Sequence, residues 1–307
     1  MKKYKILITW RLLCENIEKY KKILKKNNLI FDTLNVDQYA KKSQLLRILK
    51  KYDGIICGDD ELDREVINSA TNLKIISKWG TGLDSIDLRF AKEKKIKVFN
   101  SPGAFTDSVS DHAIALLLNI TRNITSNDQD IRNGIWSKKL CENLSDLRIG
   151  IIGYGKIGRM IHKKLKVFTK RFLINDKKKL KINVPKNKIY KVADVIILCV
   201  DLNHTTKNLI QMKQFKLMKK NTILINICRG SVIDNKALFS ALKNKLIYSA
   251  GLDVFDSEPL KKNNNLLKLD NCIFTSHNAF NSAKKIEEVN FKTIKNLIKG
   301  IKEIEKQ

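Results

Sequence analysis

RIGIIGYGKIGRMIHKKL, residues 148–165, runs from a short apolar segment through three closely spaced glycines into a segment with helical spacing. Gly153, Gly155 and Gly158 form the pattern G-x-G-x-x-G at this junction. The first glycine allows a tight turn, the second lets a pyrophosphate approach the backbone, and the third lets helix and strand pack closely. The phosphates would lie at the helix N-terminus, where free N–H groups and the helix dipole favour anions. The stretch therefore predicts a dinucleotide-binding strand–turn–helix unit.

A carboxylate ends the next apolar segment. RFLIND (171–176) places Asp176 about 20 residues after the last glycine, where it can hydrogen-bond both hydroxyls of an adenosine ribose. A carboxylate there also repels a 2′-phosphate, so we predict NAD as the cofactor. Lys177 and Lys178 follow directly and leave NADP use open.

The alternation of apolar and helical segments continues along the whole chain. The apolar segments are rich in β-branched residues and lack polar alternation, as strands of parallel sheets buried on both faces do. Segments with helical spacing, such as NKALFSALKNK (235–245), separate most of them. The predicted fold class is therefore α/β with doubly wound parallel sheets. The predicted strands are residues 5–10, 54–57, 73–79, 97–100, 148–154, 171–176, 195–200, 222–227, 250–255 and 272–276.

The chain is strongly basic, with 60 Lys and Arg against 31 Asp and Glu and a formal net charge of +29. The lysines are spread over almost every segment. The densest basic run, KKKLKINVPKNK (177–188), has no aromatic residues of the kind that stack on bases. The charge therefore favours a lysine-coated surface that attracts small anions, and argues against a specific nucleic-acid partner.

Cysteine spacing and hydropathy indicate the compartment. The six cysteines form no C-x-x-C pair and no metal-ligand spacing with the four histidines, so we predict no metal site and a reducing, cytoplasmic location. The N-terminus, MKKYKILITWR, has an apolar run too short for a signal peptide. No window approaches the roughly 20 apolar residues of a membrane span, which predicts no membrane association.

Three charged or titratable residues each follow a predicted strand. Arg229 ends NICR, Glu258 lies just past AGLDVF, and His277 follows CIFTS. In an open parallel sheet the carboxyl ends of the strands share one edge with the glycine loop, so these side chains should converge near the nicotinamide. Taken singly, Arg229 and Glu258 read more simply as a surface ion pair and His277 as a strand-end cap, and it is their joint placement on one sheet edge that favours a shared site. The other histidines, 112, 162 and 204, lie in sequence that reads as helix or loop.

The three side-chain types suit hydride transfer to a 2-oxo acid. A histidine beside the carbonyl oxygen can protonate it, and acts as the base in the reverse direction. A carboxylate on the other ring nitrogen fixes the tautomer and favours the protonated ring. A guanidinium presents a planar pair of donors to the substrate carboxylate and carbonyl.

Seven motifs follow one another along the chain: KWGTGLDSIDL (78–88), NSPGAFTDSVSDHAIALLL (100–118), RNGIW (132–136), GYGKIG (153–158), NICRG (226–230), GLDVFDSEP (251–259) and TSHNAF (275–280). In these motifs and their order, nearly the whole chain resembles the D-isomer-specific 2-hydroxyacid dehydrogenase family, which includes D-3-phosphoglycerate dehydrogenase and hydroxypyruvate/glyoxylate reductases. The resemblance implies that Arg229, Glu258 and His277 are the catalytic set, and that Asp253 holds the nicotinamide carboxamide.

The resemblance also implies which residues bind the ligands. Backbone groups of Trp79, Gly80, Thr81 and Gly82 would bind the substrate carboxylate, because closely placed glycines expose N–H groups that can form an anion-binding nest. The residues implied for the cofactor are Gly153, Gly155, Lys156, Ile157, Gly158, Asp176, Val200, Thr206, Ile227, Cys228 and Asp253.

Family architecture implies two domains. Residues 1–99 with 282–307 would form a discontinuous, flavodoxin-like substrate domain, and residues 100–281 a Rossmann NAD-binding domain. The helix over 107–124 would support a homodimer. An enzyme acting on a small anionic 2-oxo or 2-hydroxy acid is the favoured function, because all three catalytic types are retained. An NAD-sensing corepressor on the same fold is the alternative.

Two departures from the family pattern concern the substrate. Phosphoglycerate enzymes tend to carry an arginine after the strand that ends at Cys57, and this chain has Gly58-Asp59-Asp60-Glu61 there. The acidic segment argues against a phosphorylated substrate. Ser276 and Asn278 flank His277 where relatives have proline and isoleucine, which would alter the local fit around the histidine.

Overall fold

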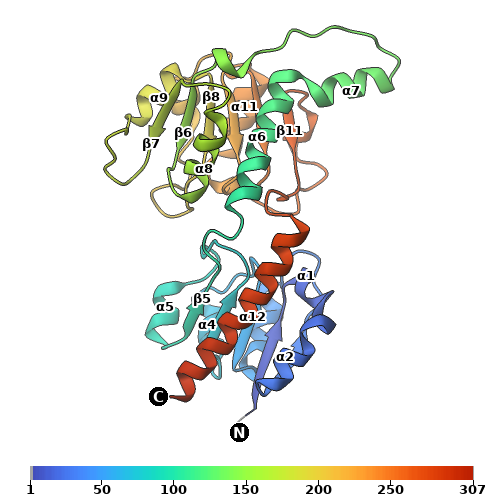
Figure 1. Cartoon of the computed structure of the whole chain (residues 1–307), viewed down its shortest axis with the longest axis vertical. Coiled ribbons are helices and arrows are strands. Elements are labelled where there is room, and N and C mark those ends of the chain that lie inside the picture. The colour runs from blue at the N-terminus through green and yellow to red at the C-terminus, as the bar shows by residue number, and fades with distance from the viewer. Residues whose placement is uncertain (1–2, 307) are drawn as a thin grey trace. The chain divides into compact units, whose positions relative to one another are not determined.

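The computed structural model describes residues 3–306 and divides the chain into two compact units (Figure 1). Met1–Phe105 and Asn281–Gln307 form the first unit, and Thr106–Phe280 form the second. Each unit is a parallel sheet with helices on both faces, which confirms the predicted fold class. Within the described residues, no helix is both long and apolar enough to span a membrane.

The first unit has a flavodoxin-like strand order. Over the part of the chain that the structure describes, its sheet has five strands in the order β2-β1-β3-β4-β5. The strands are β1 (Tyr4–Ile8), β2 (Leu29–Thr33), β3 (Gly54–Cys57), β4 (Ile75–Lys78) and β5 (Lys97–Phe99). The helices are α1 (Arg11–Cys14), α2 (Lys21–Lys26), α3 (Lys42–Ile48), α4 (Arg64–Ser69), α5 (Leu88–Glu93) and α12 (Ala283–Glu305).

Alternate residues of the strands in this unit enter two separate cores. In β1, Leu7 joins the cluster under α3, α4 and α5, whereas Ile6 and Ile8 join the cluster under α2 and α12. Leu297 of α12 is a fully buried member of the second cluster. A Cβ atom on Gly300 would lie 2.1 Å from Ile75 Cδ1, so α12 lies directly on the sheet. The C-terminal helix is therefore part of the N-terminal core.

The second unit has a Rossmann strand order. Its sheet runs β11-β10-β9-β8-β6-β7, and a parallel bridge between Ile174 and Asn183 extends the β7 edge by one short segment. Counted with this segment, the strand order is 3-2-1-4-5-6-7, in which the first six positions follow the Rossmann order and the switch point lies between β6 and β8. The strands are β6 (Ile149–Ile152), β7 (Phe172–Asn175), β8 (Val195–Leu198), β9 (Ile223–Asn226), β10 (Ser249–Leu252) and β11 (Cys272–Phe274).

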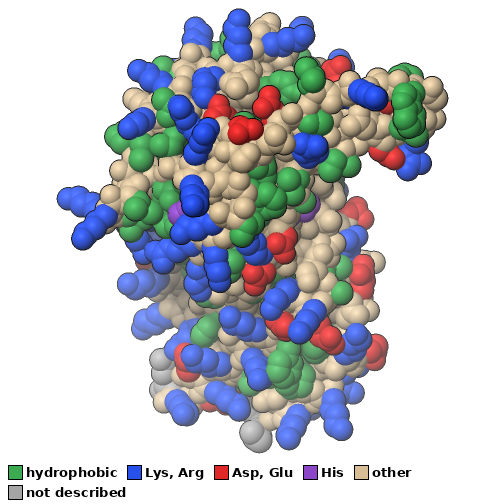
Figure 2. All heavy atoms as spheres, turned by 45° about the horizontal axis from the view of Figure 1, so that its top comes forward, with side chains coloured by type: hydrophobic (Ala, Val, Ile, Leu, Met, Phe, Trp, Pro, Cys, Tyr) green, Lys and Arg blue, Asp and Glu red, His purple; other side chains and the backbone are tan. Residues whose placement is uncertain are grey.

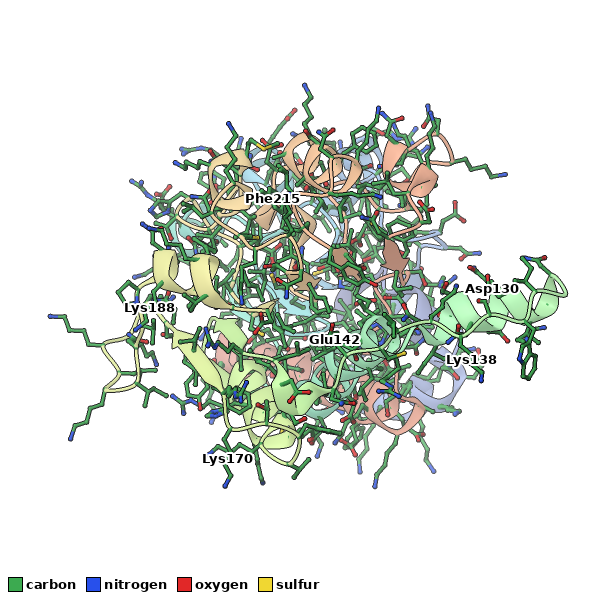
Figure 3. The ribbon with its side chains drawn as sticks, turned by 90° about the horizontal axis from the view of Figure 1, so that it is seen from above. Asp130, Lys138, Glu142, Lys170, Lys188 and Phe215 are labelled. Carbon is green, nitrogen blue, oxygen red and sulfur yellow. The ribbon has the colours of Figure 1, made fainter. Side chains whose placement is uncertain are left out.

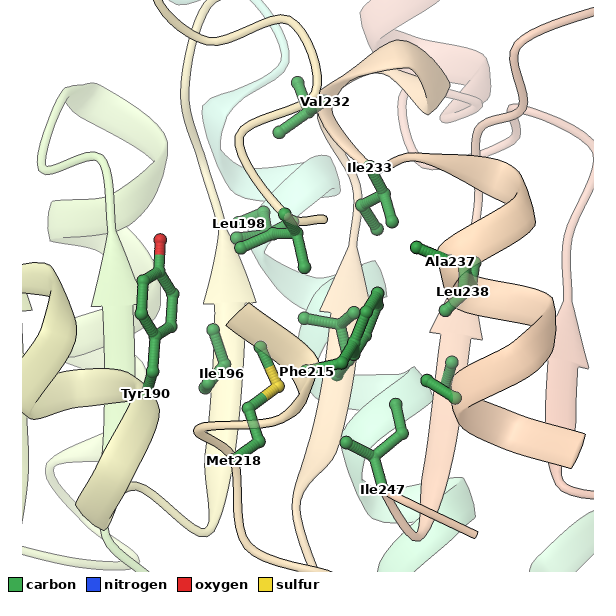
Figure 4. Packing of buried hydrophobic residues seen from close by; sticks show 14 of the residues in the cluster. Tyr190, Ile196, Leu198, Phe215, Met218, Val232, Ile233, Ala237, Leu238 and Ile247 are labelled. Atoms are coloured by element: carbon green, nitrogen blue, oxygen red, sulfur yellow. The ribbon is translucent and has the colours of Figure 1, made fainter. Parts of the chain in front are cut away.

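Helices cover both faces of the second sheet. On one face α6 packs against β9 and β10, since a Cβ atom on Gly251 would lie 3.2 Å from Leu116 Cβ and 3.4 Å from Ile120 Cδ1. The apolar stripe of α6 is therefore core. On the other face Phe215 packs among Ile196, Leu238 and their neighbours (Figure 4). The helices are α6 (Thr106–Arg122), α7 (Ile124–Arg132), α8 (Lys156–Leu165), α9 (Lys186–Val192), α10 (Met212–Phe215) and α11 (Asn235–Lys243).

All ten predicted strands form, and one strand was missed. β2 (Leu29–Thr33) is an edge strand in which only Leu29 is buried, and its short apolar run, Leu29–Phe31, is followed by two polar residues. Several predicted strands also extended beyond the C-terminal end of the observed strand. The segment 250–255 leaves the sheet after Leu252, so that Asp253 lies in the loop that follows the strand.

Candidate active site

The glycine loop leaves β6 at Gly153, whose φ of +97° is a conformation that side chains disfavour. A Cβ atom there would lie 2.4 Å from the carbonyl oxygen of Cys199. At Gly155, by contrast, an added Cβ would meet nothing within 4 Å. Lys156 and Ile157 then begin α8, whose first N–H groups have no acceptor within the helix. This loop fits a dinucleotide pyrophosphate at the open side of Gly155.

Asp176 follows β7 and contacts the glycine loop. One carboxylate oxygen accepts from the backbone N–H of Tyr154 at 2.6 Å, and the other accepts from Lys178 N at 2.8 Å. Burial raises the pKa of Asp176, but these N–H donors and the charges of Lys177 and Lys178 outweigh it, so that the pKa lies below its usual range. The carboxylate is therefore ionised, as an acceptor of ribose hydroxyls must be.

The remaining residues implied for the cofactor lie past the carboxyl ends of β8 and β9. Val200 and Thr206 follow β8, and Ile227 and Cys228 follow β9. The Thr206 hydroxyl donates to Asp201 O at 2.6 Å and accepts from Asn203 N at 2.8 Å, which stabilises the loop after β8. Burial raises the pKa of Cys228 to about 11, so its thiol stays neutral.

His277 and Glu258 form a hydrogen-bonded pair. His277 Nδ1 lies 2.7 Å from Glu258 Oε2, and both side chains are largely buried, at 19% and 18% exposed. The other carboxylate oxygen of Glu258 accepts from Phe255 N at 2.9 Å, which fixes the carboxylate in place. Because a carboxylate is an acceptor, Nδ1 carries a proton and Nε2 is left as the nitrogen that can gain or lose one.

Arg229 lies on a loop that packs against the segment of Glu258. Its neighbour Gly230 is so close to that segment that a Cβ atom would lie 2.0 Å from Phe255 C. The Arg229 side chain donates to Cys228 O at 2.8 Å, and Asn226 Nδ2 donates to Arg229 O at 2.9 Å. The structure thus brings Glu258 and His277 into contact and places Arg229 on the adjoining loop.

In the first unit, the segment Trp79–Gly82 follows β4. Gly80 has φ of +102°, and the Trp79 indole donates to Asn290 Oδ1 at 2.7 Å and stacks on Trp10 at 4.2 Å between ring centroids. The side chain of Lys78 is buried next to this segment. Its ammonium donates to Trp79 O at 3.1 Å and forms an ion pair with Asp59 Oδ1 at 3.0 Å.

The acidic segment after β3 has two different roles. Asp60 is 1% exposed and accepts from Thr9 Oγ1 at 2.7 Å, Ala40 N at 2.6 Å and Gly58 N at 2.8 Å. This carboxylate therefore holds the loops of the first unit together. Asp59 instead forms the ion pair with Lys78, so its charge is largely balanced.

Comparison with known proteins identifies the family. The model of the D-isomer specific 2-hydroxyacid dehydrogenase NAD binding domain matches residues 114–279.

The chain belongs to the D-isomer specific 2-hydroxyacid dehydrogenase family.

Individual relatives agree with this assignment. A glyoxylate reductase of Pyrococcus horikoshii is 37% identical over 251 residues, which cover 76% of this chain and 75% of the relative. A hydroxypyruvate reductase of Thermotoga maritima is 32% identical over 274 residues, which cover 86% and 90%. The crystal structure of D-lactate dehydrogenase from Aquifex aeolicus, complexed with NAD and lactic acid, superposes with a TM-score of 0.87 and 27% identity, covering 97% of this chain and 95% of that one. This D-2-hydroxyacid dehydrogenase is therefore an oxidoreductase with a nicotinamide cofactor, as predicted.

Sequence reasoning missed a contact of the dehydrogenase that joins His112 to the segment just before His277. His112 of α6 lies 2.9 Å from the hydroxyl of Thr275 and 3.3 Å from a carboxylate oxygen of Asp253. Their separation in sequence hid this contact, although Thr275 lies in the TSHNAF motif itself. Within residues 3–306 the dehydrogenase has no group of three or more His, Cys, Asp or Glu that could hold a metal ion.

Proposed function

We propose that this dehydrogenase transfers a hydride between NAD(H) and C2 of a small 2-oxo or D-2-hydroxy acid, with His277 as the general acid and base. The observation that carries the proposal is the 2.7 Å contact between His277 and Glu258, which lies past the carboxyl ends of strands in the sheet that bears the glycine loop. In an open α/β sheet, ligands bind at that edge.

The proposed chemistry follows from the protonation states of the pair. Bound NADH supplies the hydride that reaches C2 of the substrate. His277 Nε2 donates its proton to the carbonyl oxygen as negative charge develops there, and accepts it in the reverse direction. Glu258 stabilises the protonated ring and holds its orientation through Nδ1. Arg229 orients the substrate carboxylate and carbonyl with its planar pair of donors.

Three further roles rest on the family resemblance. We propose that backbone N–H groups of Trp79–Gly82 bind the substrate carboxylate and that Asp253 contacts the nicotinamide carboxamide. We also propose NAD in preference to NADP, because the ionised Asp176 repels a 2′-phosphate.

The group that C2 of the substrate carries besides its oxygen and the carboxylate is proposed to be small and uncharged, such as the hydrogen of glyoxylate or the hydroxymethyl group of hydroxypyruvate. The ammonium of Lys78, which lies beneath the Trp79–Gly82 segment, is paired with Asp59 and so offers little net charge to a phosphate. Two of the relatives described above are named glyoxylate reductase and hydroxypyruvate reductase. Both observations support glyoxylate or hydroxypyruvate over phosphohydroxypyruvate.

Oxidation of NADH and NADPH with glyoxylate, hydroxypyruvate, pyruvate and phosphohydroxypyruvate tests this assignment. We expect the highest kcat/KM for glyoxylate or hydroxypyruvate with NADH, and at least roughly tenfold less for phosphohydroxypyruvate, the discrimination that a mismatched charged group typically gives. Tight NADH binding without turnover of any 2-oxo acid would instead favour the corepressor alternative.

We propose that the dehydrogenase is a homodimer joined through an arm formed by α7 and the segment up to residue 143. The arm projects from the second unit and is marked by Asp130 and Lys138 in Figure 3. No residue of α7 is buried, and hydrophobic side chains gather near the arm's tip in Figure 2, while Lys and Arg are scattered over the visible face. The exposed apolar residues of the arm are Ile124, Ile131, Ile135, Trp136 and Leu140. Exposed apolar side chains gathered in this way (Figure 2) mark an interface, and since the apolar stripe of α6 is core, a second copy of the arm is the proposed occupant.

Substitution of exposed apolar residues of this arm by aspartate should separate the two subunits. Trp136 is 83% and Leu140 98% exposed, so the Trp136→Asp, Leu140→Asp double variant should fold normally. We expect light scattering after gel filtration to change from the dimer mass to the monomer mass. Val167→Asp, at a site 83% exposed outside the arm, serves as the matched control and should remain dimeric. A dimeric double variant, or a monomeric parent protein, would contradict the proposed interface.

A further inference from the structure

His277 has an unusual backbone conformation. Its φ is +51°, in the left-handed region that residues other than glycine seldom adopt. Such a conformation persists only where surrounding contacts hold it. Since this residue carries the proposed proton transfer, the contacts that hold its backbone also fix where Nε2 lies.

Asp253 supplies most of these contacts. Its main-chain carbonyl accepts from His277 N at 2.8 Å. Its carboxylate, which is 0% exposed, accepts from Asn278 N at 2.8 Å and Ala279 N at 3.0 Å, and from the Thr275 hydroxyl at 2.6 Å. One aspartate thus binds three consecutive N–H groups that begin at His277, together with the hydroxyl two residues before it.

The Asp253 carboxylate is charged although it is buried. Burial raises its pKa, but hydrogen bonds from His112, Thr275 and Asn278 outweigh that effect and hold the pKa below its usual range. A buried carboxylate needs a full set of donors, because each missing donor leaves a buried charge less compensated. The Asp253 carboxylate can therefore keep its hydrogen bonds to the His277 loop only while all of its donors are present.

The direction of the hydrogen bond from His112 follows from the hydroxyl of Thr275. That hydroxyl has one proton, and it donates this proton to Asp253 Oδ1. It can therefore only accept from His112 Nε2, which lies 2.9 Å away, and the nearby carboxylate oxygen at 3.3 Å is also an acceptor. His112 Nε2 must carry a proton in this arrangement.

We propose that His112 is a positioning residue for the reaction, and that its Nε2–H donates to Thr275 and Asp253 so that their contacts hold the His277 loop in its left-handed turn. His112 does this from α6, a helix otherwise packed on β9 and β10, so the helix anchors the loop after β11. The inference rests on the proposed role of His277. It requires only a hydrogen-bond donor at the position of His112 Nε2.

Two substitutions of His112 distinguish the effect of its hydrogen-bond donor from the effect of its side-chain volume. His112→Leu keeps a side chain of similar size but removes the donor, and we expect kcat to fall roughly 10- to 100-fold, the order expected for a displaced catalytic group. His112→Gln places an amide N–H near the position of Nε2, and we expect kcat within about threefold of the parent value. The NADH Kd, measured by fluorescence quenching, should change less than kcat in both, because His112 reaches the proposed cofactor site only through Asp253, which keeps its hydrogen bonds from Asn278 N and Ala279 N. Thr121→Val removes another buried hydrogen-bonding group of α6, which bonds only within its own helix, and should leave kcat unchanged.

A double-mutant cycle tests the connection to Thr275. Thr275→Val should lower kcat about as much as His112→Leu, and the combined variant should lose little more than either, since both remove one shared network. Parental kcat in His112→Leu, equal losses in the Leu and Gln variants, or fully additive losses in the cycle would each overturn the inference. If His277→Ala lacks activity while His112→Leu is fully active, only this inference fails. If His277→Ala remains active, the proposed function itself fails.

Discussion

In the His277→Ala variant, we expect kcat for reduction of the best 2-oxo acid to fall by roughly 10²–10⁴, the typical contribution of a general acid. The variant lacks the ring whose Nε2 is proposed to deliver the proton, while the glycine loop and Asp176 are untouched. NADH should therefore bind with a Kd close to the parent value. Steady-state kinetics and a fluorescence titration with NADH measure the two quantities.

His277→Gln provides the matched comparison. Its amide can still hydrogen-bond to Glu258 and fill part of the ring's volume, but it cannot transfer a proton near neutral pH. We expect a loss of kcat similar to that of the alanine variant, with an unchanged midpoint of thermal unfolding. If the glutamine variant keeps parental turnover, the histidine is not the acid.

Glu258→Gln should move the pH–rate profile, because the variant removes the negative charge 2.7 Å from His277 Nδ1. That charge favours the protonated ring, so without it the ring loses its proton at lower pH. In the reduction direction the active form is protonated, and the alkaline limb should move to lower pH by on the order of 1 unit. In the oxidation direction the active form is the free base, and the acidic limb should move to lower pH by a similar amount. The measurement is kcat against pH in both directions.

Glu258→Asp is the control for charge. It keeps a carboxylate but shortens the side chain, so kcat should fall while the limbs move less than in the glutamine variant. Glu258→Gln profiles that coincide with those of the parent enzyme would show that the carboxylate does not act through His277.

The strands and the glycine loop could be predicted because their signals are local. Six of the predicted strands, β3, β4, β6, β8, β9 and β10, are runs of fully buried residues. The loop before α8 needs a glycine at its first position, as the crowding at Gly153 shows. β2 was not found in this way, because its apolar run is only three residues long and is followed by Asp32 and Thr33. Its existence depends on pairing with β1, which is a tertiary contact.

The candidate site was predictable where it follows strand ends and not where it depends on packing. Glu258 and His277 could be brought together from topology alone, since parallel strands end at one edge. His112 could not, because its partner Thr275 lies 163 residues away and nothing local marks the contact. The acidic segment shows the same limit. Asp59 and Asp60 are adjacent and chemically identical, but only the fold decides that Asp60 is buried as a structural acceptor.

The placement of α12 affects how the chain can fold during synthesis. Ile294, Leu297 and Ile301 of this helix complete the core that contains Ile6 and Ile8 of the first strand. The ribosome therefore releases the first strand long before the helix that covers it, and the whole second unit emerges in between. Until residues 283–305 are made, the apolar face of the first sheet that α12 covers is protected only in part, by α2 and the segment before it. The nascent chain should therefore complete its second unit first and its first unit last, with chaperones shielding the open face in the interval.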